Sequence, residues 1–310
     1  MKRIYVYLFL AILSLSCAVV SYAAGTEDFN SLLPSRIADE IQKLGGPDKS
    51  AQKKSYKNLL EIGKPAVDQL MTALKDKSGS SNDLRASAAD LLGEIGDRNA
   101  VDTLMSALND RVGRVRYSAA RALGRLKDSR ATGQLMKKLD DEDYLVRAYS
   151  VEALGEIGDK VAVPSVIGKL RDQHDAVRLE AAKALGKFAD KQATSELAKT
   201  LSDDKHPDVR AAAADSLGII KDATATQDLI TALKDDAYFK ARAASAWALG
   251  ELKADEAVPF LIDTLGDEYK EPQLQASASL QKITGQSLGR NINMWREWFE
   301  RSYMPKKNVK

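Results

Sequence analysis

The chain has 310 residues, of which 44% are hydrophobic, 6% aromatic and 29% charged. Ala, Leu, Val and Ile therefore supply most of the apolar content, a mixture that favours closely packed helices. The 46 basic and 44 acidic residues leave a formal net charge of +2, far from the strongly basic balance of a general nucleic-acid binder. One cysteine and two histidines cannot form a disulfide framework or a Cys/His zinc site.

The N-terminal segment has the organisation of a secretory signal peptide. A charged start with Lys2 and Arg3 precedes an apolar run over residues 4–20, and small residues near Ala23 and Ala24 supply a cleavage site. Cleavage after Ala23 or Ala24 would remove both of these cations and bring the net charge to zero. We therefore expect an exported chain, periplasmic or secreted.

Two alternatives to cleavage remain open. Cys17 could become the acylated first residue of a lipoprotein, although Ser14 stands where such a signal prefers leucine. The apolar run could also stay as an uncleaved anchor. No second apolar segment of about 20 residues follows, so the mature chain is expected to have no membrane span.

A repeat of 31 or 32 residues organises the rest of the chain, with four columns in register. An arginine column comprises Arg85, Arg116, Arg147, Arg178, Arg210 and Arg242. Eight residues after each arginine stands a glycine preceded by leucine: Gly93, Gly124, Gly155, Gly186, Gly218 and Gly250. Six residues before the arginine stands an aspartate: Asp110, Asp141, Asp172, Asp204 and Asp236, continued by Asp267, where Gln273 replaces the arginine. Twelve residues after it stands a second aspartate: Asp97, Asp128, Asp159, Asp190 and Asp222.

Each repeat contains two segments with helical spacing of apolar residues. A short one is seen at Ala100, Val101, Leu104 and Leu108, and a longer one at Val115, Ala119, Ala122, Leu123 and Leu126. Both aspartate columns are predicted helix N-caps, since a carboxylate accepts hydrogen bonds from free backbone N–H groups. A lone helical hairpin cannot bury its apolar face, but stacked hairpins can. The sequence predicts an all-α fold, an α-solenoid of about eight hairpins.

The two ends depart from the repeat. We predict a signal peptide over 1–23, a linker over 24–34, a degenerate N-terminal capping hairpin over 35–63, the repeat array over 64–285, a C-terminal capping helix over 286–303 and a basic tail over 304–310. Trp295, Trp298 and Phe299 form an aromatic cluster at helical spacing. We interpret it as the cover of the last hairpin, with a ligand site as the alternative.

The pattern D.....VR..A..ALG.IGD resembles the HEAT repeat, in the short form of phycobilisome-lyase-like proteins, over roughly Lys64 to Thr284. In HEAT proteins the aspartate and arginine columns form a ladder between neighbouring hairpins. The resemblance implies this role for Asp110, Arg116, Asp141, Arg147, Asp172, Arg178, Asp204, Arg210, Asp236 and Arg242. It also implies a scaffold that binds a protein or peptide, with a lyase or chaperone-lyase acting on a tetrapyrrole-bearing protein as the alternative.

Known catalytic patterns are missing from the sequence. HEAT-type di-iron hydroxylases use His-Glu pairs, but Asp175 follows His174 and Pro207 follows His206. No GxSxG or GxxxxGK[ST] motif occurs. We expect no catalysis, no cofactor and no metal, and two isolated, solvated histidines.

The positions two, five and nine residues after the arginine vary between repeats and share one face of the longer helix, the concave face by resemblance to HEAT arrays. At the last two positions the sign of the charge alternates: Asp90 and Glu94, Arg121 and Arg125, Glu152 and Glu156, Lys183 and Lys187. One interpretation is a set of salt bridges between repeats. The other is a charge-striped groove for a zwitterionic peptide. Either argues against a polyanion track.

The alternation ends at Asp215 with Ile219 and at Trp247 with Glu251. We predict that Trp247, near Tyr238 and Phe239, is an exposed binding residue, with packing against the C-terminal aromatic cluster as the alternative. The candidate partner-binding residues are Trp247, Tyr149, Arg121, Arg125, Lys183 and Lys187. The expected molecule is a monomer whose partner is a protein or peptide and not a nucleic acid.

Overall fold

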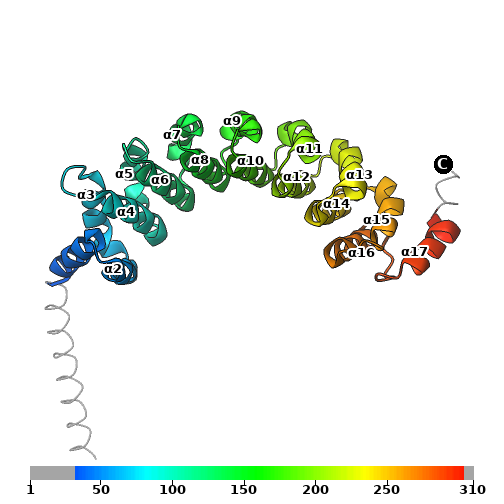
Figure 1. Ribbon diagram of the computed structural model, residues 1–310, viewed down its shortest axis with the longest axis horizontal. Helices are drawn as coiled ribbons and strands as arrows, with labels where there is room; N and C mark the ends of the chain where they lie inside the picture. The colour runs from blue at the N-terminus through cyan, green and yellow to red at the C-terminus, as the bar shows by residue number, and fades with distance from the viewer. Residues whose placement is uncertain (1–31, 304–310) are drawn as a thin grey trace, which may run out of the picture. The chain divides into compact units, whose positions relative to one another are not determined.

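The computed structural model describes residues 32–303, which form helices and short turns (Figure 1). The predicted signal peptide with Cys17, most of the predicted linker and the basic tail over 304–310 lie outside the described residues. The chain divides into two compact units, Met1–Thr103 and Leu104–Lys310, with the boundary inside α5 (Val101–Ala107).

The first unit contains two helical hairpins. Their elements are a helix over 32–45, α2 (Lys49–Ile62), η1 (Lys64–Ala66), α3 (Val67–Lys75), α4 (Asn82–Ile95) and η2 (Arg98–Ala100). Leu59, Leu70 and Leu91 are fully buried in its core. The longer loop before α4 is organised by Asp76, whose Oδ1 accepts hydrogen bonds from the backbone N–H groups of Ser78 (3.1 Å) and Gly79 (2.8 Å).

The second unit stacks one hairpin on the next. Its long helices are α6 (Gly113–Leu126), α8 (Tyr144–Ile157), α10 (Asp175–Phe188), α12 (Pro207–Ile220), α14 (Phe239–Leu252) and α16 (Lys270–Thr284). Its short helices are α7 (Thr132–Lys137), α9 (Val163–Gly168), α11 (Thr194–Asp203), α13 (Thr226–Asp235) and α15 (Val258–Thr264). Short 3₁₀ turns flank the short helices: η3 (Ser129–Ala131), η4 (Lys138–Asp140), η5 (Lys160–Ala162), η6 (Lys169–Arg171), η7 (Lys191–Ala193), η8 (Ala223–Ala225) and η9 (Asp255–Ala257).

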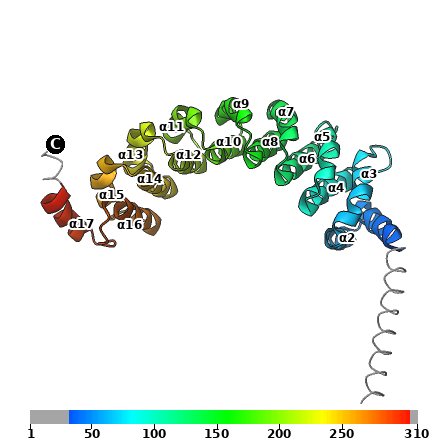
Figure 2. The same ribbon diagram turned by 180° about the vertical axis from the view of Figure 1, so that it is seen from behind.

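Within this unit the long helices follow one side of the stack and the short helices follow the other (Figures 1 and 2). Alanine and leucine side chains such as Ala119, Leu123 and Leu135 fill the space between the two rows, each with no exposed surface. Burial of this apolar stripe is the main stabilising term, because a helical hairpin alone leaves it in water. The arrangement confirms the predicted all-α solenoid of stacked hairpins.

The glycine column lets successive long helices approach closely. A Cβ added to Gly124 would lie 2.8 Å from the Cα of Ala153 on the next long helix. A Cβ added to Gly218 would lie 2.8 Å from the Cα of Ala248 and 2.6 Å from Cζ3 of Trp247. Contacts this short exclude any side chain, so the column records a steric limit on the stacking of α6 on α8 and of α12 on α14.

The two aspartate columns differ in their roles. Asp128 and its equivalents cap the 3₁₀ turns, as predicted: Asp128 Oδ1 accepts a hydrogen bond from the N–H of Arg130 at 3.0 Å. The prediction for the other column is wrong by two residues. Asp141 ends η4 and its Oδ1 accepts from the N–H of Asp143 (3.1 Å), while Asp143 itself is the N-cap of α8. Asp141 therefore lies before the helix and does not cap it, and its carboxylate also binds Arg116.

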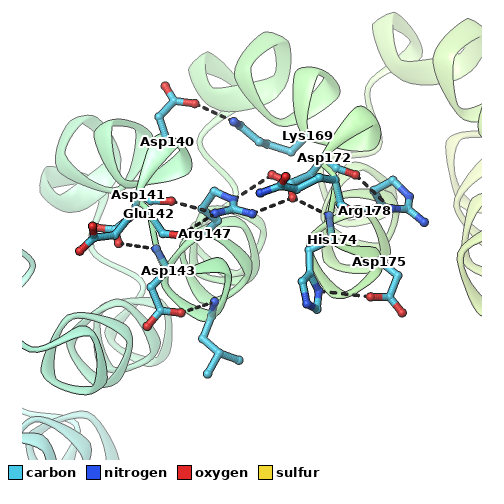
Figure 3. A network of polar contacts seen from close by, with 12 residues as sticks. Asp140, Asp141, Glu142, Asp143, Arg147, Lys169, Asp172, His174, Asp175 and Arg178 are labelled. Atoms are coloured by element: carbon cyan, nitrogen blue, oxygen red, sulfur yellow. Dashed lines mark hydrogen bonds and ion pairs between the residues drawn. The ribbon is translucent and has the colours of Figure 1, made fainter.

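The arginine column joins one repeat to the next (Figure 3). Arg147 donates from Nε and Nη2 to the two carboxylate oxygens of Asp172, at 2.8 and 2.9 Å, and from Nη1 to the backbone oxygen of Asp141 at 2.9 Å. The same bidentate contact joins Arg178 to Asp204, Arg210 to Asp236 and Arg242 to Asp267. In the first of these repeats, Arg116 reaches Asp141 through Nη2 alone, at 2.7 Å.

These ion pairs lie in the interior of the stack. The side chains of Arg147 and Asp172 are each 7% exposed. Burial raises the pKa of Asp172, but hydrogen bonds from Arg147 and from the His174 N–H, with the charge of Arg147, hold the pKa below its usual value. The guanidinium thus offsets the cost of burying the carboxylate, and the geometry is the bidentate one that makes such pairs strong.

The last repeat lacks the arginine and is covered by an additional helix. Gln273 donates to the backbone oxygen of Asp267 at 2.6 Å but carries no guanidinium to reach further. α17 (Ile292–Trp298) continues as a π turn over Phe299–Tyr303 and contacts α15. Trp295 is fully buried and donates from Nε1 to the backbone oxygen of Gly289 at 2.8 Å. Its ring contacts Trp298 edge to face at 5.6 Å, so the aromatic cluster packs at the end of the array.

Candidate functional site

The residues that vary between repeats lie on the side of the long helices turned away from the short ones, and they form what we call the variable face. Its members in the second unit are Arg121, Arg125, Tyr149, Glu152, Glu156, Glu180, Lys183, Lys187, Asp215, Ile219, Trp247 and Glu251. They are exposed or half-buried, whereas the residues on the opposite side of the same helices are buried. Helical spacing places positions five and nine one turn apart on this face.

On α6, α8 and α10 the charges of the variable face pair with one another. Glu156 accepts from Lys187 of the next repeat at 2.6 Å and from Lys127 of the preceding repeat at 2.9 Å. Hydrogen bonds from these two lysines lower the pKa of Glu156. Lys183 pairs with Glu180 on its own helix at 2.8 Å. The two candidate lysines are thus already engaged within the molecule.

The candidate arginines lie beside them. The guanidinium carbon of Arg121 lies 5.7 Å from the ring centroid of Tyr149, and Tyr149 stacks on Tyr117 at 5.4 Å. Arg121 and Arg125 line a hollow of about 330 Å³. The other residues that line it are Gly124, Lys127, Glu152, Ala153 and Glu156. Burial, followed by the charge of Glu180, raises the pKa of Glu152. This hollow is polar and carries both signs of charge.

On α12 and α14 the variable face changes character. The indole of Trp247 lies over Gly218 of the preceding repeat and is half-buried. The ring contacts of the C-terminal cluster, within residues 32–303, join Trp295, Trp298, Phe299 and Tyr303 and do not include Trp247. No ring contact among these residues supports the alternative in which Trp247 packs against that cluster. Tyr238 and Phe239 do not flank Trp247 either: they lie more than two turns away at the start of α14, where Phe239 stacks on Tyr269 at 4.6 Å.

Asp215 and Ile219 share this part of the face with Trp247. Ile219 is 47% exposed, and Asp215 is exposed as well. Within the described part of the chain, the Asp215 carboxylate has no hydrogen bond and no ion pair. Desolvation by the surrounding protein, and then the negative charge of Glu271, raise its pKa to about 6. The sequence marked this position only as the place where the alternation of charge stops.

Two lysines of this part of the variable face form ion pairs with Glu251. Glu251 accepts from Lys221 at 2.9 Å and is also in contact with Lys282 of the next repeat. The pKa of Glu251 is lowered by hydrogen bonds from these two lysines. This arrangement repeats the one around Glu156, with a glutamate bridging lysines of the repeats before and after it.

The two histidines are partly exposed to solvent, as predicted, but they are not isolated. His174 stacks on Tyr144 with ring centroids 3.6 Å apart, and its Nδ1 lies 3.2 Å from Asp175 (Figure 3). His206 Nε2 lies 3.4 Å from the other carboxylate oxygen of Asp175.

Residues 32–303 contain no group of three or more His, Cys, Asp or Glu side chains arranged to hold a metal ion. Over the same range, no helix combines the length and apolarity needed to cross a bilayer.

Stacked hairpins, an internal Arg–Asp ladder and a variable outer row of side chains define an α-solenoid repeat protein. Family models for HEAT repeats match residues 78–137, 104–168, 132–218 and 163–249, which together cover more than half of the chain. The chain therefore belongs to the HEAT repeat family. The model for the PBS lyase HEAT-like repeat matches residues 241–267.

Solved structures agree with this fold. A mutant of Kap121p is similar with a TM-score of 0.63 at 14% identity, covering 87% of this chain and 35% of Kap121p. YibA of Escherichia coli has a TM-score of 0.56 at 20% identity, covering 83% of this chain and 99% of YibA. The CpcE–CpcF complex of phycocyanin lyase from a Nostoc species has a TM-score of 0.45 at 24% identity, covering 79% and 93%. No curated protein matches the sequence.

Proposed function

We propose that this protein is a non-catalytic scaffold of the cell envelope that binds another protein or a peptide along its variable face. The observation that carries the proposal is the surface on α12 and α14, where Trp247 lies beside an exposed isoleucine and an aspartate without a partner. Tryptophan is among the residues that contribute most to protein interfaces, and an apolar residue beside it adds area that water leaves on binding.

The location rests on the N-terminal segment. Its charged start, apolar run and small residues near Ala23 are the features that export signals share. We propose a periplasmic or secreted protein, with a lipid anchor at Cys17 as the less favoured arrangement. Mass spectrometry of the mature N-terminus distinguishes the two, because acylation leaves cysteine as the first residue and adds the mass of the lipid.

Capture from an envelope extract tests the binding role. The immobilised protein is expected to retain a specific protein, and Trp247→Ala is expected to release most of it. A charge-reversed variant, Arg121→Glu with Arg125→Glu, tests the hollow on α6 and α8 in the same way. Leu32→Ala, at an exposed position far from the variable face in the sequence, is the control. Retention that is equal for all four proteins would reject binding through this face.

A second candidate is a lyase or chaperone-lyase subunit acting on a tetrapyrrole-bearing protein. It is supported by the match of residues 241–267 to the PBS lyase HEAT-like repeat. Incubation of the purified protein with a bilin and an acceptor apoprotein tests it. A change in the bilin absorbance spectrum that depends on this protein would favour the second candidate over the first.

A further inference from the structure

The carboxylate of Asp215 is placed where its negative charge is costly. Protein atoms around it disfavour the charged form, and the charge that acts on it is the like charge of Glu271. Glu152 occupies the same repeat position on α8 and also lacks a direct ion pair, but the charges of Lys187 and Arg121 oppose the rise in its pKa. Among residues 32–303, no opposite charge acts on Asp215 in this way. Side chains whose pKa is shifted strongly by desolvation occur frequently at functional sites.

Trp247 provides an aromatic surface next to this carboxylate. Its ring lies over Gly218, which is three residues from Asp215 and adjacent to Ile219 on α12. Residues three and four apart on a helix are neighbours, so Asp215 and Ile219 share one turn of α12, and the ring covers the glycine of that turn. The indole N–H of Trp247 has no hydrogen-bond acceptor among residues 32–303, in contrast to that of Trp295, which is bonded to Gly289.

We propose, on the basis of the binding function argued above, that the surface formed by Asp215, Ile219 and Trp247 recognises a lysine or arginine side chain of a protein partner. The cationic head would pair with Asp215 and lie against the indole, since a cation is attracted to the face of an aromatic ring. The aliphatic stem of the same side chain would cover Ile219. An arginine or lysine is the side chain that offers both features together.

The charges around this surface argue for a basic partner. Lys221 and Lys282 already bind Glu251, and Lys240 at the start of α14 interacts with Tyr238. Glu271 also interacts with Lys240, whereas Asp215 has no ion pair among residues 32–303 and faces the like charge of Glu271. An acidic partner would be repelled here, whereas a cation would offset the desolvation of this carboxylate.

A peptide-display selection on the purified protein tests the proposal. Heptapeptides from a random library are selected on the wild type, on Asp215→Asn and on Asp228→Asn. The last variant is the matched control, because it makes the same carboxylate-to-amide change at an exposed position of the short helix α13, outside the variable face. We expect peptides enriched in lysine or arginine from the wild type and from Asp228→Asn. We expect that enrichment to disappear with Asp215→Asn.

Affinity measurements on an enriched peptide then locate the contact. Replacing its basic residue by citrulline, which has the shape of arginine without the charge, should weaken binding to the wild type about tenfold. Asp215→Asn should weaken binding of the basic peptide by a similar factor and remove the difference between the two peptides. Circular dichroism at pH 7.5 shows whether each variant is folded, and Asp215→Asn should melt no lower than the wild type.

The outcomes separate this inference from the wider function. Enrichment of peptides without basic residues, or basic peptides bound equally well by Asp215→Asn, overturns the inference and leaves protein binding intact. A wild type that enriches no peptide overturns both proposals. Light scattering that shows a dimer of the wild type, dissociated by Asp215→Asn, would assign the surface to a second copy of this chain and would also overturn the proposal.

Discussion

The long helices α6, α8 and α10 carry the same arginine and glycine columns as α12 and α14, but their variable faces differ. In the first group Glu156 bridges lysines of two repeats, so opposite charges neutralise one another. In the second group Glu251 bridges lysines in the same way, but among residues 32–303 Asp215 has no ion pair, and Trp247 and Ile219 replace charged residues. The contrast shows that different positions of the repeat stabilise the stack and supply the side chains of the variable face. The framework stays constant while part of the variable face changes from paired charges to an aromatic ring, an apolar side chain and a carboxylate.

The ladder should be equally important in both groups. Arg147→Ala and Arg210→Ala each remove a guanidinium from a buried carboxylate, Asp172 or Asp236. Each substitution should lower the free energy of unfolding by about 3 kcal/mol, because the remaining aspartate stays buried without its partner. Urea unfolding measures both. Arg130→Ala, which breaks an exposed pair with Asp128, is the control and should cost less than about 1 kcal/mol. A large difference between the two ladder variants would mean that the groups also differ in their framework.

The glycine column should be sensitive in both groups for a steric reason. Gly124→Ala and Gly218→Ala place a Cβ within 2.8 Å of a backbone atom of the next long helix. We expect each to cost about 2 kcal/mol, the usual effect of overpacking. Gly218→Ala should in addition displace the indole of Trp247, which the tryptophan fluorescence spectrum would report. An unchanged spectrum would show that Trp247 is free to move away from Gly218.

The two carboxylates of the variable face should respond to pH in opposite directions. The folded pKa of Asp215 is raised to about 6, so its unfavourable effect on stability grows as the pH rises from about 4 to about 6 and is complete above that. Asp215→Asn should therefore stabilise the protein at pH 7.5, on the order of 1 kcal/mol once screening at an exposed site is allowed for, and should have little effect at pH 4. Thermal melts at the two pH values measure this effect.

Glu156→Gln gives the contrasting case. The folded pKa of Glu156 is lowered by Lys187 and Lys127, so its contribution is present above its usual pKa and is lost as the pH falls through the lowered value. The substitution should therefore destabilise at pH 7.5, by less than about 1 kcal/mol because the pairs are partly exposed. A stabilising Glu156→Gln, or a destabilising Asp215→Asn, would remove the distinction between the two groups.

The smallest effect is expected from the surface lysines. Lys187→Ala removes one of the two partners of Glu156. The side chain of Lys187 is 42% exposed and that of Glu156 is 33% exposed. The substitution should cost about 0.5 kcal/mol at low salt and less at 1 M NaCl, since salt screens exposed pairs. Denaturant unfolding at two salt concentrations measures it. A cost that persists at high salt would show that the pairing is not purely electrostatic.

Much of the fold could be predicted because it is repeated. The arginine, glycine and aspartate columns reveal the hairpin, and the apolar spacing around Val115 and Leu123 indicates which side of each long helix is buried. The N-cap prediction for Asp141 failed by two residues, because sequence spacing does not show which backbone N–H groups a carboxylate will meet. The contacts of the two histidines could not be predicted for a related reason. His174 and His206 are far apart in sequence, but both meet Asp175 once the repeats stack.

The candidate site was only partly predictable. Trp247 was recognised because it interrupts a column of charged residues. Asp215 was not proposed as a binding residue, because one more aspartate among many gives no signal in the sequence. Its distinction depends on what surrounds it: Glu271, from a helix two repeats further on, and the absence of a cation. The roles of Lys183 and Lys187 changed likewise once Glu180 and Glu156 were seen to hold them.

The sequence by itself determined the hairpin, its period, the residues that stack it and its family, because each of these depends on local spacing repeated many times. Only the tertiary structure decided which charges are neutralised and which are left open. That outcome depends on pairs about 30 residues apart, such as Lys187 with Glu156, and on desolvation, which no single helix contains. Stacking brings these groups within a few ångströms of one another, and the same packing leaves Asp215 without an ion pair among residues 32–303, one helical turn from the glycine that Trp247 covers.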